Sequence, residues 1–308
     1  MAWVRTKKER LIAVAEMELG PEELLTTEEA GQLTVIWRRF RKHRLALISL
    51  FFIVFLLLVA ILAPWLMPYP YQEIDVPNAF ASPSAEHWLG TDQLGRDVLS
   101  RLMWGTRISL YVGIAATVLG QFFGVLVGSV SGYYGGRVDT LLMRLTDFFL
   151  TLPSLPLLLV LSVILNATVE VVIIILAMLG WMGAARLVRG VVLSLREQEF
   201  IEASHALGMS DTKIIVRHMI PNSMAPIIVN LTLGIGTTII VEAALSFLGF
   251  GVRPPTPSWG NMLNRVQDYV LMNPFLAIYP GLAIFFTVLA FNFMGDGLRD
   301  ALDPRLKM

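Results

Sequence analysis

The sequence predicts an all-α, polytopic membrane protein with six transmembrane helices. Of the 308 residues, 55% are hydrophobic and only 16% are charged, whereas a soluble domain carries about a quarter charged residues. Uncharged apolar stretches of about membrane-spanning length recur from residue 45 onward. We therefore expect a polar N-terminal segment over 1–44, followed by one membrane domain over 45–308.

Six apolar stretches are the predicted spans. The first follows a long charged segment, so it is interpreted as an uncleaved membrane helix and not as a signal peptide. The third contains Pro153 and Pro156, which are expected to kink it. The fourth is short and is bounded by Glu170 and Arg186, with the arginine reaching toward the interface. The predicted spans are 45–67, 108–132, 148–169, 171–188, 225–250 and 275–294.

The distribution of basic residues predicts cytoplasmic termini. The termini and the segments 133–147 and 186–224 hold 19 of the 24 lysines and arginines, and the opposite loops hold five. The run RRFRKHR (Arg38–Arg44) precedes the first span. It is interpreted as a topology anchor on anionic headgroups, in preference to a specific lipid or partner site. A surface helix is expected over 5–19.

Motifs of several enzyme classes are missing from the sequence. There is no GxxxxGK[ST] loop, no HExxH, no GxSxG and no cysteine, and the four histidines are scattered. The net charge is zero, which argues against a nucleic-acid partner. Within the spans, Glu242 is the one acid well away from an end, so proton relays are not evident. These observations predict a conduit without catalytic or metal-binding residues; an autonomous secondary transporter or channel for a small polar solute stays an alternative.

One polar segment, FIEASHALGMSDTKIIVRHMIPN (Phe200–Asn222), separates two apolar stretches. A helix is expected over 194–207, ended by a left-handed Gly208. Ser210 is expected to cap a second helix, with Asp211 in its first turn. The two helices form a compact knob on the cytoplasmic face, where insertion into a groove of another protein and a flat position on the headgroups fit equally well. The predicted apolar face of the first helix consists of Phe200, Ala203, Ala206 and Leu207.

This segment resembles the EAA loop of ABC-importer permeases. The spacing of that loop is matched by Glu202, Ala203, Ser204, Gly208 and Pro221, although Ser204 replaces an alanine and His218 departs from the general pattern. Three further stretches, at 87–110, 132–154 and 242–263, resemble the second permease subunit of dipeptide, oligopeptide and nickel importers. They read HWLGTDQLGRDVLSRLMWGTRISL, GYYGGRVDTLLMRLTDFFLTLPS and EAALSFLGFGVRPPTPSWGNML. The resemblance covers nearly everything after residue 33.

The resemblance implies the fold and the role of the chain. It implies a type I ABC importer transmembrane domain in a prokaryotic inner membrane, forming half of a translocation path for dipeptides or oligopeptides. The implied partners are a homologous second permease, two ATPase subunits that carry ATP and magnesium, an extracytoplasmic binding protein and membrane lipid. The chain itself holds no cofactor. The residues that the resemblance assigns to contact with the ATPase are Glu202, Ala203, Ser204, Leu207 and Gly208.

Two further groups of polar residues are candidate sites. One face of the fifth predicted span carries small and polar residues at helical spacing, which fits a lining of the translocation path and helix packing equally. Glu242 on that face is a candidate contact for the external loop GTDQLGRD. The charged residues of that loop are expected to brace the next span in preference to contacting the binding protein. The path candidates are Ser223, Asn230, Gly234, Thr238 and Glu242; the external candidates are Asp92, Arg96 and Asp97.

Two shorter patterns complete the expectations. An apolar stripe over 138–149 predicts a helix at the membrane surface that leads into the third span. The segment PPTPSWG, 254–260, has the chemistry of a rigid turn and is expected to shape the external mouth.

Overall fold

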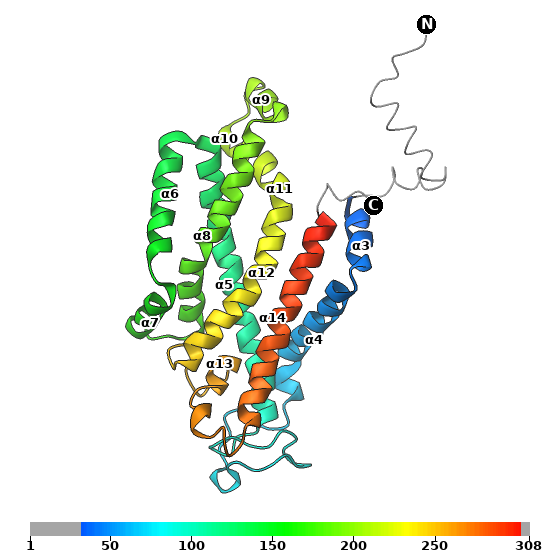
Figure 1. Cartoon of the computed structure of the whole chain (residues 1–308), viewed down its shortest axis with the longest axis vertical. Helices are drawn as coiled ribbons and strands as arrows, with labels where there is room; N and C mark the ends of the chain where they lie inside the picture. Colours follow the sequence, from blue (N-terminus) through cyan, green and yellow to red (C-terminus); the bar gives the residue numbers. More distant parts are fainter. Residues whose placement is uncertain (1–31, 303–308) are drawn as a thin grey trace, which may run out of the picture.

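The long helices of the protein stand side by side along one axis (Figure 1). The computed structural model describes residues 32–302, and the helix expected over 5–19 lies outside them. The α-helices are α3 (Gln32–Lys42), α4 (Arg44–Leu66), α5 (Val98–Tyr134), α6 (Gly136–Thr151), α7 (Ser154–Ile164), α8 (Val169–Arg196), α9 (Glu199–Ala206), α10 (Asp211–Ile214), α11 (Ile220–Asn222), α12 (Met224–Phe247), α13 (Trp259–Met262) and α14 (Phe275–Leu302). A π-helix over Ile215–Met219 joins α10 to α11.

Among the described residues, five helices are long and apolar enough to cross a membrane, or six if the bent pair α6–α7 counts as one span. The predicted span 148–169, expected to be kinked, is divided between two helices. The chain leaves the helix at Leu152 and Pro153, and α6 and α7 meet at 86°. Proline lacks an N–H group and disfavours helical backbone in the residue before it, so the expected kink becomes a full break.

The apolar stripe over 138–149 lies on α6, which runs alongside α8 instead of lying across the end of the bundle (Figure 1). Two ion pairs connect these helices. Arg189 Nε lies 2.5 Å from Asp139 Oδ1, and Arg186 binds Asp147 at 2.5 Å. Both arginines lie on α8, which continues to Arg196, beyond the predicted end at residue 188.

Helices α5 and α8 make a backbone-to-backbone contact at one row of glycines. Gly120, Gly124, Gly128 and Gly132 recur every four residues on α5. A Cβ atom on Gly124 would lie 2.6 Å from the carbonyl oxygen of Trp181, and one on Gly132 would lie 2.9 Å from that of Arg189. Small residues at this spacing let two membrane helices approach closely. The pair therefore forms a stiff shaft through the bundle.

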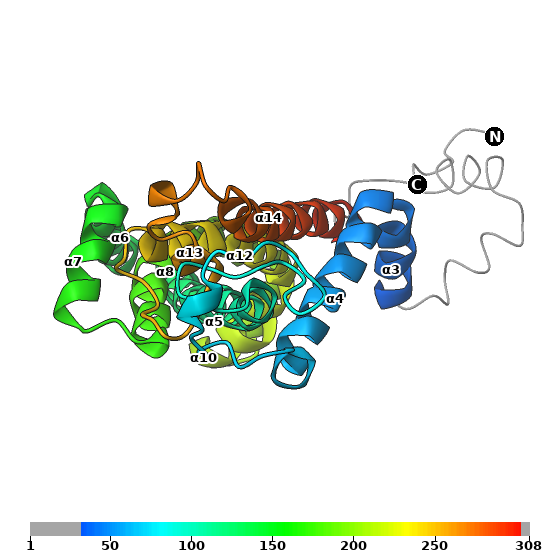
Figure 2. The ribbon, with the colours of Figure 1, turned by 90° about the horizontal axis from the view of Figure 1, so that it is seen from below.

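The two ends of the bundle differ in what they carry. The α9–α11 segment is at one end, together with the described chain ends in α3 and α14 (Figure 1). The long connections over 67–97 and 248–274 are at the other end, where they cross over the tips of α5 and α12 (Figure 2). The shaft of α5 and α8 connects the two ends.

Candidate coupling site and outer network

The helix α9 ends in a Schellman motif. Gly208 has φ +74°, its N–H donates to the carbonyl of His205 (2.9 Å), and the N–H of Met209 donates to that of Ser204 (3.1 Å). A Cβ on Gly208 would meet nothing within 4 Å. Glycine is therefore required here for its left-handed backbone and not for space. The sequence prediction for this residue is confirmed.

Tyr133, near the end of α5, holds both helices of the knob. Its hydroxyl donates to Asp211 Oδ1 (2.8 Å) and lies 3.2 Å from His205 Nε2. The two rings stack with centroids 5.9 Å apart. Arg196 Nη1, at the end of α8, donates to the carbonyl of Tyr133 (3.2 Å). These bonds fix α9 and α10 to the ends of the α5–α8 shaft.

An apolar cluster lies beneath the same helices. Ile201 of α9, Ile214 of α10 and Met219 of the π-helix are almost fully buried, and they pack with Val188 and Val192 of α8. Burial of such side chains contributes about 1.5–3 kcal/mol each relative to exposure. The knob is thus a rigid extension of the shaft.

The outward face of α9 is exposed. Leu207 is 85% exposed and Phe200 is 42% exposed, and Glu202 and Ala203 are also exposed. The predicted apolar face therefore points away from the protein, and the buried side is the one with Ile201. The residues assigned to ATPase contact share the outer face except for Ser204.

Two polar residues of the knob differ from expectation. Ser204 is buried, and its hydroxyl donates to the carbonyl of Phe200 (2.7 Å), so the serine in place of alanine is satisfied within the helix. Ser210 stands at the N-cap of α10 without a capping bond from its side chain. The predicted cap is therefore wrong, and Asp211 of the first turn is oriented toward Tyr133.

The polar face of α12 lies against α5. Asn230 Nδ2 donates to Gln121 Oε1 (2.7 Å), and Thr117 Oγ1 donates to Thr238 Oγ1 (2.8 Å). A Cβ on Gly234 would lie 2.9 Å from Thr117 Cγ2. These are contacts of helix packing, and Asn230, Gly234 and Thr238 are each half-buried. Ser223 is buried one turn after Met219 and donates to its carbonyl (2.8 Å).

Glu242 is fully buried where α12 meets α5 and the segment before α13. It accepts from Ser246 Oγ (2.7 Å) and Ser109 Oγ (3.5 Å), and Ser109 Oγ accepts from the N–H of Trp259 (3.1 Å). In the described part of the chain the carboxylate bonds to serine hydroxyl groups and not to the loop over 90–97, so the candidate contact with that loop is not formed. Glu242 instead ties the PPTPSWG turn to two long helices.

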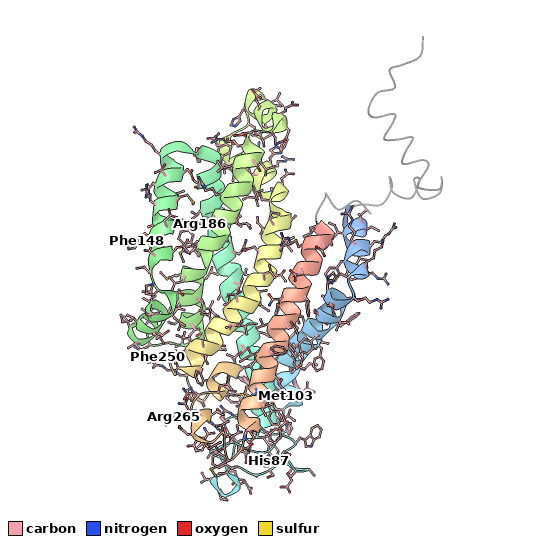
Figure 3. All side chains as sticks on the ribbon, in the orientation of Figure 1. His87, Met103, Phe148, Arg186, Phe250 and Arg265 are labelled. Carbon is pink, nitrogen blue, oxygen red and sulfur yellow. The ribbon has the colours of Figure 1, made fainter. Side chains whose placement is uncertain are left out.

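The three external candidates are all buried. Asp92 Oδ2 accepts from Arg96 Nε (2.7 Å) and lies 3.4 Å from Arg101 Nε. Asp97 is the N-cap of α5, accepting from the N–H of Ser100 (2.7 Å), and lies 2.9 Å from His87 Nδ1. Figure 3 labels His87 at this end of the molecule. These bonds brace the start of α5. They explain why α5 begins ten residues before the predicted span.

A wide groove, not foreseen from the sequence, lies between α4, α5 and α8. It has a volume of about 1280 Å³ and extends from Trp65 and Trp104 to Phe122. Arg107 and Glu170, both exposed, border it, and the Arg107 guanidinium lies 5.3 Å from the Trp104 ring centroid. The remaining lining is mainly aliphatic. No sequence pattern indicates it, because its residues come from three separate helices.

The arrangement of long helices with a short exposed helix held at one end also occurs in a solved ABC importer transmembrane domain. A solved structure of this kind, the inward-facing MetNI methionine ABC transporter, matches with a TM-score of 0.52 and 19% sequence identity, over 66% of this chain and 97% of that one. At this identity the match supports the fold alone.

The sequence comparisons give the family. Residues 124–308 match the model of the binding-protein-dependent transport system inner membrane component, and residues 31–83 match the N-terminal TM domain of oligopeptide transport permease C. The chain is 45% identical over 272 residues to the glutathione transport system permease protein GsiD of Escherichia coli O6:K15:H31, covering 88% of this chain and 90% of that protein. It is 44% identical over 271 residues to the dipeptide transport system permease protein DppC of Alkalihalophilus pseudofirmus, covering 88% and 89%.

The chain therefore belongs to the binding-protein-dependent inner membrane component family, as an OppC-type permease. It is a non-catalytic, multi-pass permease subunit of a bacterial inner-membrane ABC importer, whose ATPase and other subunits are separate proteins. This membership decides against the autonomous secondary transporter or channel.

Proposed function

We propose that this chain forms half of the translocation path of an importer for short peptides, and that partner ATPases move it through α9. The relatives named for glutathione and for dipeptides support a peptide substrate. In this assembly a homologous second permease completes the path, two ATPases carry ATP and magnesium, and an extracytoplasmic binding protein delivers the substrate. Both termini are cytoplasmic, as the excess of basic residues at that end supports.

The observation that carries the proposal is that α9 is fixed on one side and exposed on the other. Tyr133 and Ile201 attach it to the α5–α8 shaft, while Leu207 and Glu202 face outward. A helix held this way transmits movement of a partner groove to the spans without bending. The exposed leucine suits an apolar floor in that groove, and Glu202 suits a basic residue at its rim.

For the path itself we propose the groove between α4, α5 and α8. Its polar border supports this assignment, because charged side chains on a membrane-facing surface are costly unless they meet water or a partner. Arg107 suits the carboxylate of a peptide and Glu170 suits its ammonium group. This groove replaces the polar face of α12, whose side chains are occupied by α5.

Two substitutions in the knob test the docking role. Gly208→Pro forbids the left-handed backbone at the end of α9, since proline fixes φ near −65°. Glu202→Arg reverses the charge of the exposed face. In both variants we expect normal membrane insertion, with loss of ATPase copurification and of transport. The matched control is Glu86→Arg, an exposed charge reversal at the opposite end. Unchanged transport in both knob variants would contradict the docking role.

A further inference from the structure

A basic helix and an apolar groove meet at the start of α4. Arg38 and Arg41 of α3 and Arg44 of α4 are exposed. None of the ion pairs found within 32–302 includes these three arginines. Trp37, 49% exposed, stacks on Phe40 with ring centroids 5.9 Å apart, the kind of aromatic side chain that favours a membrane interface.

The basic helix is held in place against the bundle. Phe40 is 4% exposed and packs with Ala46 of α4 and Ala301 of α14. Gly297 of α14 makes this possible, because a Cβ there would collide with Ala46 and lie 3.3 Å from the Phe40 ring. Helix α3, which carries Arg38 and Arg41, is therefore held at a fixed position beside α4 and α14 (Figure 1).

The groove begins at Leu45, the residue that follows Arg44. It has a volume of about 200 Å³ and is lined by Leu45, Ile48 and Phe52 of α4 and by Phe286, Leu289 and Phe293 of α14. Arg44 and Ile48 are four residues apart and thus on one helix face. At 1.5 Å per residue the lining extends roughly 10 Å along α4, away from the charged end.

We propose that this junction is a binding site for an anionic phospholipid, with its phosphate on Arg41 and Arg44 and an acyl chain in the groove. The arginine fork matches a phosphate, and juxtamembrane basic residues attract anionic lipid. The nearby end of α14 carries Asp296 and Asp300 against the single base Arg299, so it adds no net attraction. The headgroup is therefore assigned to the α3–α4 side. The site does not depend on the proposed substrate or coupling role.

Native mass spectrometry of the intact importer, delipidated in detergent and titrated with phosphatidylglycerol or phosphatidylcholine of equal chains, tests the site. We expect retention of phosphatidylglycerol over phosphatidylcholine. Arg41→Gln with Arg44→Gln weakens that retention roughly 25-fold, at about fivefold per juxtamembrane arginine. Ile48→Trp fills the groove and also lowers retention. The controls are Arg137→Gln with Arg144→Gln, exposed bases of α6, and Val54→Trp, on exposed α4 surface outside the groove.

Three results would overturn the site. Equal retention of the two lipids excludes a phosphate-selective site. If the arginine variant lowers the retention of phosphatidylglycerol and Ile48→Trp does not, the arginines attract the lipid headgroup without an acyl chain in the groove. Equal losses in the control variants show that the site is elsewhere. A variant that fails to assemble is recognised by loss of the partner subunits from the spectrum, and Arg44→Gln alone then gives the same comparison with about a fivefold effect.

Discussion

The two ends of the molecule use charged residues in opposite ways. In the loop over 90–97, Asp92, Arg96 and Asp97 are all less than a tenth exposed and bind one another or the backbone of their own segment. In the knob, Glu202 is exposed while the bonds that hold α9 run through Tyr133 and buried apolar side chains. Charges that bind within their own segment brace the fold. Charged side chains that point outward from a helix held in place, as Glu202 does on α9, are available to a partner.

The largest expected effect comes from breaking the buried external network. Asp92→Ala leaves Arg96 and Arg101 buried without their carboxylate, and removing one partner of a buried pair costs roughly 3–5 kcal/mol. We expect a sharply lower yield of folded protein and a lower thermal midpoint in detergent. Glu73→Gln, an exposed external acid, is the control and should change neither. A normal midpoint for Asp92→Ala would show that the network is not structural.

The next effect tests the shaft between the two ends. In Gly124→Ala the new Cβ would lie 2.6 Å from the Trp181 carbonyl oxygen, so α5 and α8 must separate. Overpacking of this kind costs roughly 1–3 kcal/mol. We expect reduced thermal stability and less transport per ATP hydrolysed. Gly183→Ala, on the exposed face of α8 with nothing within 4 Å of the new Cβ, is the matched control. If the two alanine variants have equal thermal stability and equal transport per ATP hydrolysed, the close contact between α5 and α8 is not needed for either property.

The smallest expected effect concerns the bond between the shaft and the knob. Tyr133→Phe removes the hydroxyl that donates to Asp211 of α10 and bonds to His205 of α9, and one such bond contributes about 1 kcal/mol to stability. We expect a protein that still folds and still binds its ATPase but imports less substrate per ATP hydrolysed. Tyr279→Phe, at a tyrosine of α14 outside the knob and outside the groove between α4, α5 and α8, is the control. A wild-type ratio of transport to hydrolysis in Tyr133→Phe would show that this bond does not position α9.

Much of this architecture follows from local sequence signals. Runs of uncharged apolar residues predict the long helices, and Gly208 predicts the end of α9 because few other residues adopt its backbone. The glycine row over 120–132 is also visible in the sequence, yet its partner helix is not, because spacing alone does not tell which helix packs against it.

The points that local sequence signals leave open are tertiary. The amphipathic pattern of α9 indicates an apolar face, but it does not show which side of the helix is buried. The buried side is the one that carries Ile201. The polar face of α12 is indistinguishable from a path lining until Gln121 and Thr117 are placed opposite it. Pro153 signals a kink, while the 86° angle is set by how α6 packs on α8.

Cross-linking at the tip of α9 tests the central claim most directly. The chain has no cysteine, so Leu207→Cys introduces one unique, exposed thiol. With single cysteines introduced into the ATPase groove, we predict cross-linking of Leu207→Cys to the ATPase, and none for the equally exposed Leu271→Cys at the opposite end. Absence of any ATPase cross-link at Leu207→Cys in an assembled, ATP-hydrolysing importer would contradict the assignment of α9 as the coupling helix.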